Sequence, residues 1–240
     1  MANNTKIGLL RWEEGHVPQG LLQLETLKGN VTNPESYPFQ VDMRQVEGAC
    51  SETVIMHPSQ EVCDRFIEIG KEMQAEGIKA ITGSCGFNAI FQKPISEAID
   101  IPVFMSSLLQ VPFVLQIIAP SKKIAVMTAY GSRLTAEHFS YCGVKDMSRI
   151  IVLGLENCSE WNAIFENEDE PVDMDLVEKE IMGTALGAVK DHPEIGAFVL
   201  ECTDLPPFAP AIREATGLPV FSFNTMMGYM AMALGELNLY

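Results

Sequence analysis

The sequence has little positive charge. Its 16 Lys and Arg residues stand against 32 Asp and Glu residues, which gives a formal net charge of −16 at pH 7. Nucleic acids and anionic membrane surfaces would repel such a chain, so we expect neither as a partner. A small anionic substrate is compatible with this charge, because backbone amides at helix N-termini bind anions locally.

The sequence also shows no pattern typical of a targeting segment or of a membrane span. Residues 1–6 are polar and lack the apolar stretch and cleavage site typical of a signal peptide. The most apolar stretch, residues 101–119, contains two prolines and two glutamines, which favours a strand followed by a buried helix over a membrane span. We therefore expect a cytoplasmic protein.

Metal and nucleotide motifs are lacking as well. The 6 cysteines form no C-x-x-C pair, and the 4 histidines show no H-x-x-x-H or H-x-H spacing. The cysteines are thus expected to be reduced thiols, and a dedicated metal site is not expected. No G-x-G-x-x-G or G-K-[ST] loop is present, which argues against a bound nucleotide. The sequence predicts chemistry without a metal or cofactor.

An internal repeat is the strongest feature that the sequence does contain. Residues 78–104 align with residues 195–221 at a constant offset, with 10 identities in 27 ungapped positions. The offset is the separation of Cys85 and Cys202 (202 − 85 = 117), and it also aligns two apolar runs that begin near Lys6 and Lys123. We infer a duplicated α/β unit.

Each repeat alternates buried strands with amphipathic helices, which is typical of a parallel sheet covered by helices. We predict an α/β fold of two pseudo-symmetric three-layer α/β/α domains, with mainly parallel sheets and the active site in the cleft between them. Residues 1–118 and 224–240 would form the first domain, and residues 119–223 the second. The last helix is assigned to the first domain because it has no counterpart inside the second repeat.

The individual elements follow from the same patterns. Strands are predicted over residues 6–11, 78–84, 102–105, 123–128, 150–154, 197–201 and 220–223, and helices over residues 60–76, 89–99, 132–141, 174–191, 207–216 and 225–237. Residues 30–38 and 166–171 are expected to be solvated connections or lids. His138 is expected at the surface or at a subunit interface.

Two cysteines each follow a predicted buried strand, Cys85 in the first repeat and Cys202 in the second. Ligands of open parallel sheets bind beyond the carboxyl ends of the strands. A thiol beside a helix N-terminus ionises more easily, and two thiols across one cleft can exchange protons with opposite faces of a carbon atom. Alternatively, both cysteines are inherited core residues, although Cys85 is flanked by the turn-forming residues Gly83, Ser84 and Gly86.

The residues around the cysteines resemble the aspartate/glutamate racemase superfamily, which also includes hydantoin racemases, maleate isomerases and arylmalonate decarboxylases. The motif LECTDLP (200–206) is similar to the second cysteine motif of the family, and AIREATGLPVFSF (211–223) resembles the segment after it. The resemblance implies a homodimeric, cofactor-independent enzyme that acts on a small carboxylate, with Cys85 and Cys202 as its two acid/base residues.

The resemblance also implies substrate-binding residues. Ser84, Gly86 and Thr203 adjoin the cysteines, and Thr128 and Ser132 match a Thr-rich turn at the start of the second domain. For the last two, a strand-end hydroxyl at Thr128 and a helix N-cap at Ser132 are equally good readings.

Two departures from the family pattern leave the substrate open. Phe87 stands where amino-acid racemases carry a hydroxyl, and RWEEG (11–15) lacks the glycine-rich turn of the family. Arg11 could pair with a substrate carboxylate, while Trp12 and Phe87 could line an apolar pocket.

The leading hypothesis is an amino-acid racemase, an isomerase that uses both thiols on a carbon next to a carboxylate. One alternative is a hydantoin racemase, a decarboxylase or a cis–trans isomerase on the same scaffold. Another is a two-lobed protein that binds a small acid without converting it, for which unperturbed reactivity of both thiols would be the signature.

Overall fold

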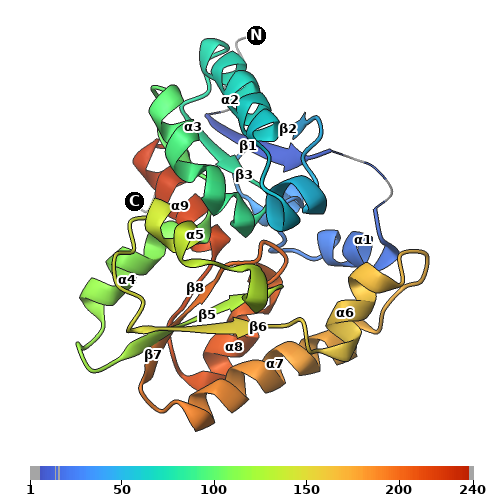
Figure 1. Ribbon diagram of the computed structural model, residues 1–240, viewed down its shortest axis with the longest axis vertical. Helices are drawn as coiled ribbons and strands as arrows, with labels where there is room; N and C mark the ends of the chain where they lie inside the picture. The colour runs from blue at the N-terminus through green and yellow to red at the C-terminus, as the bar shows by residue number, and fades with distance from the viewer. Residues whose placement is uncertain (1–5, 14, 16, 238–240) are drawn as a thin grey trace.

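Two four-stranded parallel sheets, one in each half of the chain, form the framework of this computed structural model (Figure 1). The structure describes residues 6–13, 15 and 17–237, so Glu14, His16 and the outermost residues of the predicted first domain lie outside the described residues. The predicted α/β fold with parallel sheets and flanking helices is confirmed.

The first sheet has the order β2-β1-β3-β4, and all its strand pairs are parallel. Its strands are β1 (Ile7–Trp12), β2 (Val41–Val46), β3 (Ala80–Gly83) and β4 (Val103–Phe104). The connections contain the helices α1 (Gln19–Glu25), α2 (Gln60–Ala75), α3 (Gln92–Ala98) and α4 (Val111–Ile117). Shorter helical turns are η1 (Pro34–Ser36), η2 (Glu52–Met56), η3 (Gly86–Phe91) and η4 (Ser107–Gln110).

The second sheet has the order β6-β5-β7-β8 and is also parallel. Its strands are β5 (Lys123–Thr128), β6 (Ile150–Gly154), β7 (Ile195–Leu200) and β8 (Val220–Phe221). The helical elements are η5 (Gly131–Arg133), α5 (Ala136–Tyr141), α6 (Ser159–Glu166), α7 (Met174–Asp191), η6 (Pro206–Phe208), α8 (Ala209–Thr216) and α9 (Phe223–Ala233).

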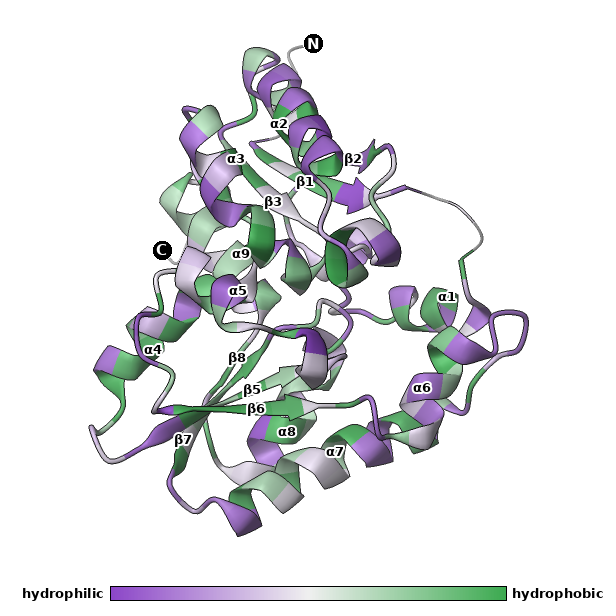
Figure 2. Ribbon diagram, in the orientation of Figure 1, coloured by the Kyte–Doolittle hydropathy of each residue, from purple (hydrophilic) through white to green (hydrophobic). Residues whose placement is uncertain are grey.

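The repeat is visible in this topology, because both sheets have the same strand order. The offset of 117 residues carries β4 onto β8 residue for residue and places β3 inside β7. Strands β5 and β6 are largely apolar, whereas polar and apolar residues alternate along α2 (Figure 2). This contrast is typical of strands covered by helices whose outer faces meet water.

One hydrophobic core joins the two halves. It contains Leu10 and Ile81 of the first sheet together with Val126 and Val199 of the second. Helix α9 packs on the face of the first sheet that points away from this shared core. Its buried residues form one hydrophobic cluster with Ile7 and Leu9; they are Phe223, Met226, Met227 and Ala231. The division into residues 1–118 plus 224–240 and residues 119–223 stays a prediction.

Helix α1 lies against α6 of the second half, at the right of Figure 1. Gly20 leaves room for this contact, since a Cβ there would lie 3.0 Å from the Cα of Ile164. The Gln23 side chain donates to the Val172 carbonyl at 3.1 Å and accepts from the Val172 amide at 2.8 Å. Helix α1, although it belongs to the first 118 residues, thus packs against the second half of the chain.

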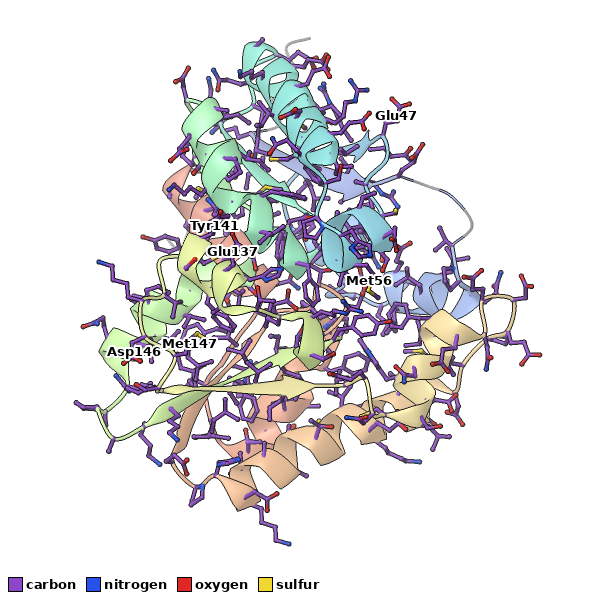
Figure 3. The ribbon with its side chains drawn as sticks, viewed as in Figure 1. Glu47, Met56, Glu137, Tyr141, Asp146 and Met147 are labelled. Atoms are coloured by element: carbon purple, nitrogen blue, oxygen red, sulfur yellow. The ribbon has the colours of Figure 1, made fainter. Side chains whose placement is uncertain are left out.

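The helix predicted over 132–141 is shorter than expected. It begins after Thr135, whose hydroxyl forms a capping box with His138, so Ser132 is not its N-cap. His138 is buried and packs edge-on against Phe87 with ring centroids 5.5 Å apart, which corrects the expectation of a surface position. Glu137 and Tyr141, labelled in Figure 3, lie on the same helix, and Glu137 is exposed.

The helix predicted over 225–237 also differs at both ends. It begins at Phe223, because the Ser222 hydroxyl forms a capping box with Thr225, and it ends at Ala233. Gly235 follows with φ 73°, a left-handed conformation that terminates helices. None of the helices formed by the described residues has the length and apolarity needed to cross a membrane.

Candidate functional site

The two cysteines lie at the carboxyl ends of equivalent strands. Cys85 comes two residues after β3 and is half-buried, and Cys202 comes two residues after β7 and is 8% exposed. The strand ends are joined directly, because the Thr203 hydroxyl donates to the Ser84 carbonyl at 2.7 Å. The structure therefore brings the two predicted cysteines to one site between the halves.

Both thiols are harder to ionise than expected. Burial raises the pKa of Cys85 well above its ordinary value, and the neighbouring Glu201 raises this pKa further. Burial likewise raises the pKa of Cys202, followed by the charges of Asp204 and Glu201. Backbone N–H groups, including that of Phe87 beside Cys85, act in the opposite direction but are outweighed. The expectation that a helix N-terminus makes these thiols acidic is therefore wrong for this structure.

Asp204 is a site residue that sequence reasoning missed. Its Oδ2 accepts from the Cys202 thiol at 3.7 Å, and its Oδ1 accepts from the Asn30 side-chain amide at 2.8 Å. Burial raises the pKa of Asp204 to about 6, while the bonds from Asn30 and Cys202 lower it. Its position two residues after Cys202 in the LECTDLP motif was the available signal.

Glu201 is the second missed residue. It directly precedes Cys202 and is fully buried, and its Oε2 accepts from the Thr128 hydroxyl at 2.6 Å. Burial raises the pKa of Glu201 to about 7. A Glu at the end of an otherwise apolar strand was the signal, because a carboxyl group is rarely buried without a specific reason.

The segment 30–38 is not a simple solvated connection. Asn30 and Val31 are buried, and Asn30 links this segment to Asp204 in the other half. Gly29 makes the close approach possible: its φ is 109°, and a Cβ would lie 3.0 Å from the Cα of Pro207. Asn224 donates to the Gly29 carbonyl at 2.7 Å and anchors the same turn.

The predicted binding hydroxyls are engaged by the protein itself. Thr128 bonds to Glu201, and Thr203 bonds to the Ser84 carbonyl. The Ser132 amide donates to the Glu156 carboxylate at 2.9 Å, as does the amide of the preceding glycine. A substrate carboxylate at that turn would have to compete with Glu156.

The other predicted residues have different surroundings. Trp12 contacts the site through its amide, which donates to the Ser84 hydroxyl at 3.3 Å, and through its ring nitrogen, which donates to Asn88 at 3.4 Å. Phe87 is 2% exposed and belongs to the shared core, so it does not line an open pocket. Arg11 lines a surface hollow formed mainly by residues 25–35.

Tyr130 is an aromatic residue near the site that the sequence did not single out. It packs against the hydrophobic cluster that contains Cys202. Burial raises the pKa of Tyr130, and the charge of Cys202 raises it further. Its ring lies 5.9 Å from that of Phe165. Within the described part of the chain, no three His, Cys, Asp or Glu side chains form a metal site. Chemistry without a cofactor stays a prediction.

No family model matches the sequence, but curated relatives do. Dimethylsulfoniopropionate lyase of Durusdinium sp. clade D is 32% identical over 216 residues, which cover 86% of this chain and 71% of the relative. This chain belongs to the dimethylsulfoniopropionate lyase family. Dimethylsulfoniopropionate lyase 3 of Emiliania huxleyi (strain CCMP1516) is 32% identical over 98% of this chain, which spans 61% of that relative. Lyase 7 of the same strain is 35% identical over 86% of this chain.

Solved structures confirm the fold of the aspartate/glutamate racemase superfamily. Allantoin racemase from Klebsiella pneumoniae has a TM-score of 0.60 at 14% identity and covers 97% of this chain, which covers 89% of it. An aspartate racemase homologue from Pyrococcus horikoshii OT3 has a TM-score of 0.58 at 14% identity, with 97% and 100% covered. Unliganded arylmalonate decarboxylase has a TM-score of 0.55 at 18% identity, with 96% and 92% covered.

The predicted activity needs correction. The amino-acid racemase hypothesis and its isomerase class are wrong, because the relatives at 32–35% identity are named as lyases of another substrate. None of the stated alternatives names this reaction either. The error has a physical origin: a thiol pair at strand ends predicts proton transfer at carbon, whereas the fate of the carbanion depends on the substrate.

Proposed function

We propose that this dimethylsulfoniopropionate lyase homologue cleaves dimethylsulfoniopropionate by elimination, with a cysteine thiolate as the base. The observation that carries the proposal is the 32% identity to a named lyase over 98% of this chain. The two thiols at joined strand ends support it, because they offer a base beside a carbon acid.

The reaction needs one base and no redox partner. The substrate is a propionate that carries a positively charged dimethylsulfonium group on the carbon next to the acidic CH₂. A thiolate removes a proton from the carbon beside the carboxylate, and the C–H electron pair becomes the new C=C bond. The C–S bond breaks with its electron pair on sulfur. The products are dimethyl sulfide, acrylate and a protonated thiol, so atoms and charge balance.

Charge complementarity supports a cationic substrate. The charged groups that raise the pKa values of the two thiols are Glu201 and Asp204, and Glu25 acts on Asp204 in turn. A sulfonium cation about 4 Å from a thiolate would favour the ionised form by about 4 kcal/mol at an effective dielectric constant of about 20. Substrate binding would then ionise a thiol that stays protonated in the free enzyme. Tyr130 adds an aromatic face, which also attracts cations.

The two thiols are proposed to have unequal roles. The Cys202 thiol donates to the Asp204 carboxylate, and one backbone N–H, that of Asp204, lowers the pKa of Cys202. Two backbone N–H groups, those of Phe87 and Asn88, lower the pKa of Cys85 and favour its thiolate form. We assign Cys85 as the base and Cys202 as the neutral thiol beside it. The predicted homodimer and cytoplasmic location also stay proposals; a reducing compartment would keep both thiols free.

The test is a gas-chromatographic assay of dimethyl sulfide, with acrylate followed by NMR, for the wild-type chain and three variants. We expect Cys85→Ser to lose about 10²–10⁴-fold in kcat/KM, the usual contribution of a general base. Cys202→Ser should lose less. Cys50→Ser, which changes an exposed cysteine outside the site, is the matched control and should retain full activity. Absence of dimethyl sulfide with the wild-type chain would refute the proposal.

A further inference from the structure

The Glu201 carboxyl group is buried with only one of its two oxygens satisfied. Oε2 accepts from Thr128, while Oε1 is buried and has no hydrogen-bond partner among the described residues. A buried acceptor without a partner costs about 1–3 kcal/mol. The fold does not account for a carboxyl group here, since the preceding residues of β7 are apolar.

The unpartnered oxygen lies against the segment that carries Cys85. A Cβ built on Gly86 would collide with Glu201 Oε1 and with the Glu201 carbonyl, so the segment that carries Cys85 and the end of β7 are in close contact at this glycine. Gly86 directly follows Cys85. The carboxyl group also acts on Cys202 and on Cys142, at the C-terminal end of α5. Glu201 is therefore a charged group that raises the pKa values of all three thiols.

We propose that Glu201 is a positioning residue whose protonation state decides whether the Cys85 thiol can lose its proton. This inference rests on the proposed role of Cys85 as the base. An ionised Glu201 places a negative charge beside the thiol and opposes a thiolate, whereas a protonated Glu201 does not. The two groups thus share one negative charge and titrate as a coupled pair.

The surroundings of the pair support this coupling. Burial raises the pKa of Glu201 to about 7, so its charge changes in the neutral range. The other charged group that acts on Cys85 is Asp204, whose pKa is raised to about 6 by burial. Both carboxyl groups raise the pKa of Cys202, and Cys202 raises the pKa of Tyr130. These groups would remain unchanged in a Glu201 variant.

The test measures the Cys85 thiol directly. Wild-type, Glu201→Gln and Glu201→Asp proteins are alkylated with iodoacetamide between pH 6 and pH 10, and the Cys85 peptide is quantified by mass spectrometry. At pH 8 we expect alkylation in Glu201→Gln to be on the order of 10- to 100-fold faster, the effect of a unit charge several ångströms away at an effective dielectric constant of about 20. Glu201→Asp keeps the charge and should stay near wild type. The exposed Cys50 is the internal control and should react equally in all three.

Thr128→Val provides a second, independent variant. It removes the hydrogen bond that lowers the pKa of Glu201, so the carboxyl group stays neutral to higher pH and Cys85 alkylation should also accelerate. Equal Cys85 alkylation in wild type and in the folded variants would overturn the inference. If Glu201→Gln fails to fold, the rate of Cys85 alkylation in Thr128→Val tests the inference: a faster rate than in wild type supports it, and an equal rate refutes it.

The lyase assay separates this inference from the proposed function. Faster Cys85 alkylation without dimethyl sulfide production by the wild type refutes the lyase proposal but leaves the coupling of Glu201 to Cys85 intact. Dimethyl sulfide production with unchanged alkylation refutes the role of Glu201 alone. With both properties present, the pH at which kcat/KM rises should be lower in Glu201→Gln than in wild type.

Discussion

The buried Glu201 should make the stability of the protein depend on pH in a defined window. Its pKa is raised from an ordinary value of 4.5 to about 7 by burial. Below pH 4.5 the carboxyl group is protonated in both the folded and the unfolded chain, so its titration does not change the free energy of unfolding. Between pH 4.5 and about 7 only the unfolded chain ionises, so the free energy of unfolding falls as the pH rises. Above about pH 7 the loss is constant.

The size of the effect follows from the same two values. A difference of one pKa unit corresponds to about 1.4 kcal/mol, so ionisation of Glu201 should lower the free energy of unfolding by about 3 kcal/mol in total. Glu201→Gln keeps an acceptor for the Thr128 hydroxyl but cannot ionise. Its packing can add a constant offset relative to wild type, but it adds no dependence on pH.

The assay is urea unfolding of wild type and Glu201→Gln at pH 5, 6, 7 and 8. Titrating groups that do not interact with Glu201 contribute equally to both proteins and cancel in the difference, and burial keeps Cys85 and Cys202 protonated at these pH values. We expect the variant to gain about 2–3 kcal/mol relative to wild type between pH 5 and pH 8. A difference that stays constant across these four values would refute the reasoning and show that Glu201 titrates normally.

Two further substitutions test the contacts that assemble the site. Gly86→Ala should lower the free energy of unfolding by about 1–3 kcal/mol in urea, because its Cβ would collide with Glu201. Gly187→Ala on α7, where a Cβ meets nothing within 4 Å, should instead stabilise by about 0.5–1 kcal/mol, and equal effects would contradict the proposed contact. Asn30→Ala removes a donor from Asp204 and should cost about 1–3 kcal/mol in the same measurement. Wild-type stability in that variant would contradict the role of the Asn30 segment.

Much of the fold was predictable from local patterns. The predicted strands over 123–128 and 150–154 and the predicted helix over 174–191 match β5, β6 and α7. Each is a regular stretch whose apolar period fixes its type. The internal repeat then supplied the parallel topology, because the same offset relates strands that occupy equivalent places in both sheets.

Strand β2 was missed because it lies at a sheet edge. It reads Val-Asp-Met-Arg-Gln-Val, and only Val46 is buried, so its composition resembles an exposed connection. The repeat offset gave no help either. Its counterpart β6 projects by 117 residues onto 33–37, whereas β2 spans Val41–Val46, because the connections differ in length between the halves.

The cysteines of the site were predictable, but their partners were not. Cys85 and Cys202 follow strands in a repeated position, which is a local signal. Asn30 meets Asp204 across 174 residues, and such a contact leaves no periodic trace in the sequence. The thiol pKa values were misjudged for the same reason: burial and two carboxyl groups, both set by tertiary contacts, outweigh the backbone amides.

The racemase fold and the proposed lyase chemistry share their first step. Both require removal of a proton from a carbon beside a carboxylate, and strand-end thiols can perform it. After that step a racemase must return a proton, whereas a substrate with a cationic leaving group on the next carbon loses that group instead. The residues beside Cys202 are compatible with the second case, because the Glu201 and Asp204 carboxyl groups, where ionised, would attract a cation. On this argument the substrate supplies the positive charge that lets a buried thiol act as a base, and a neutral analogue should leave it protonated.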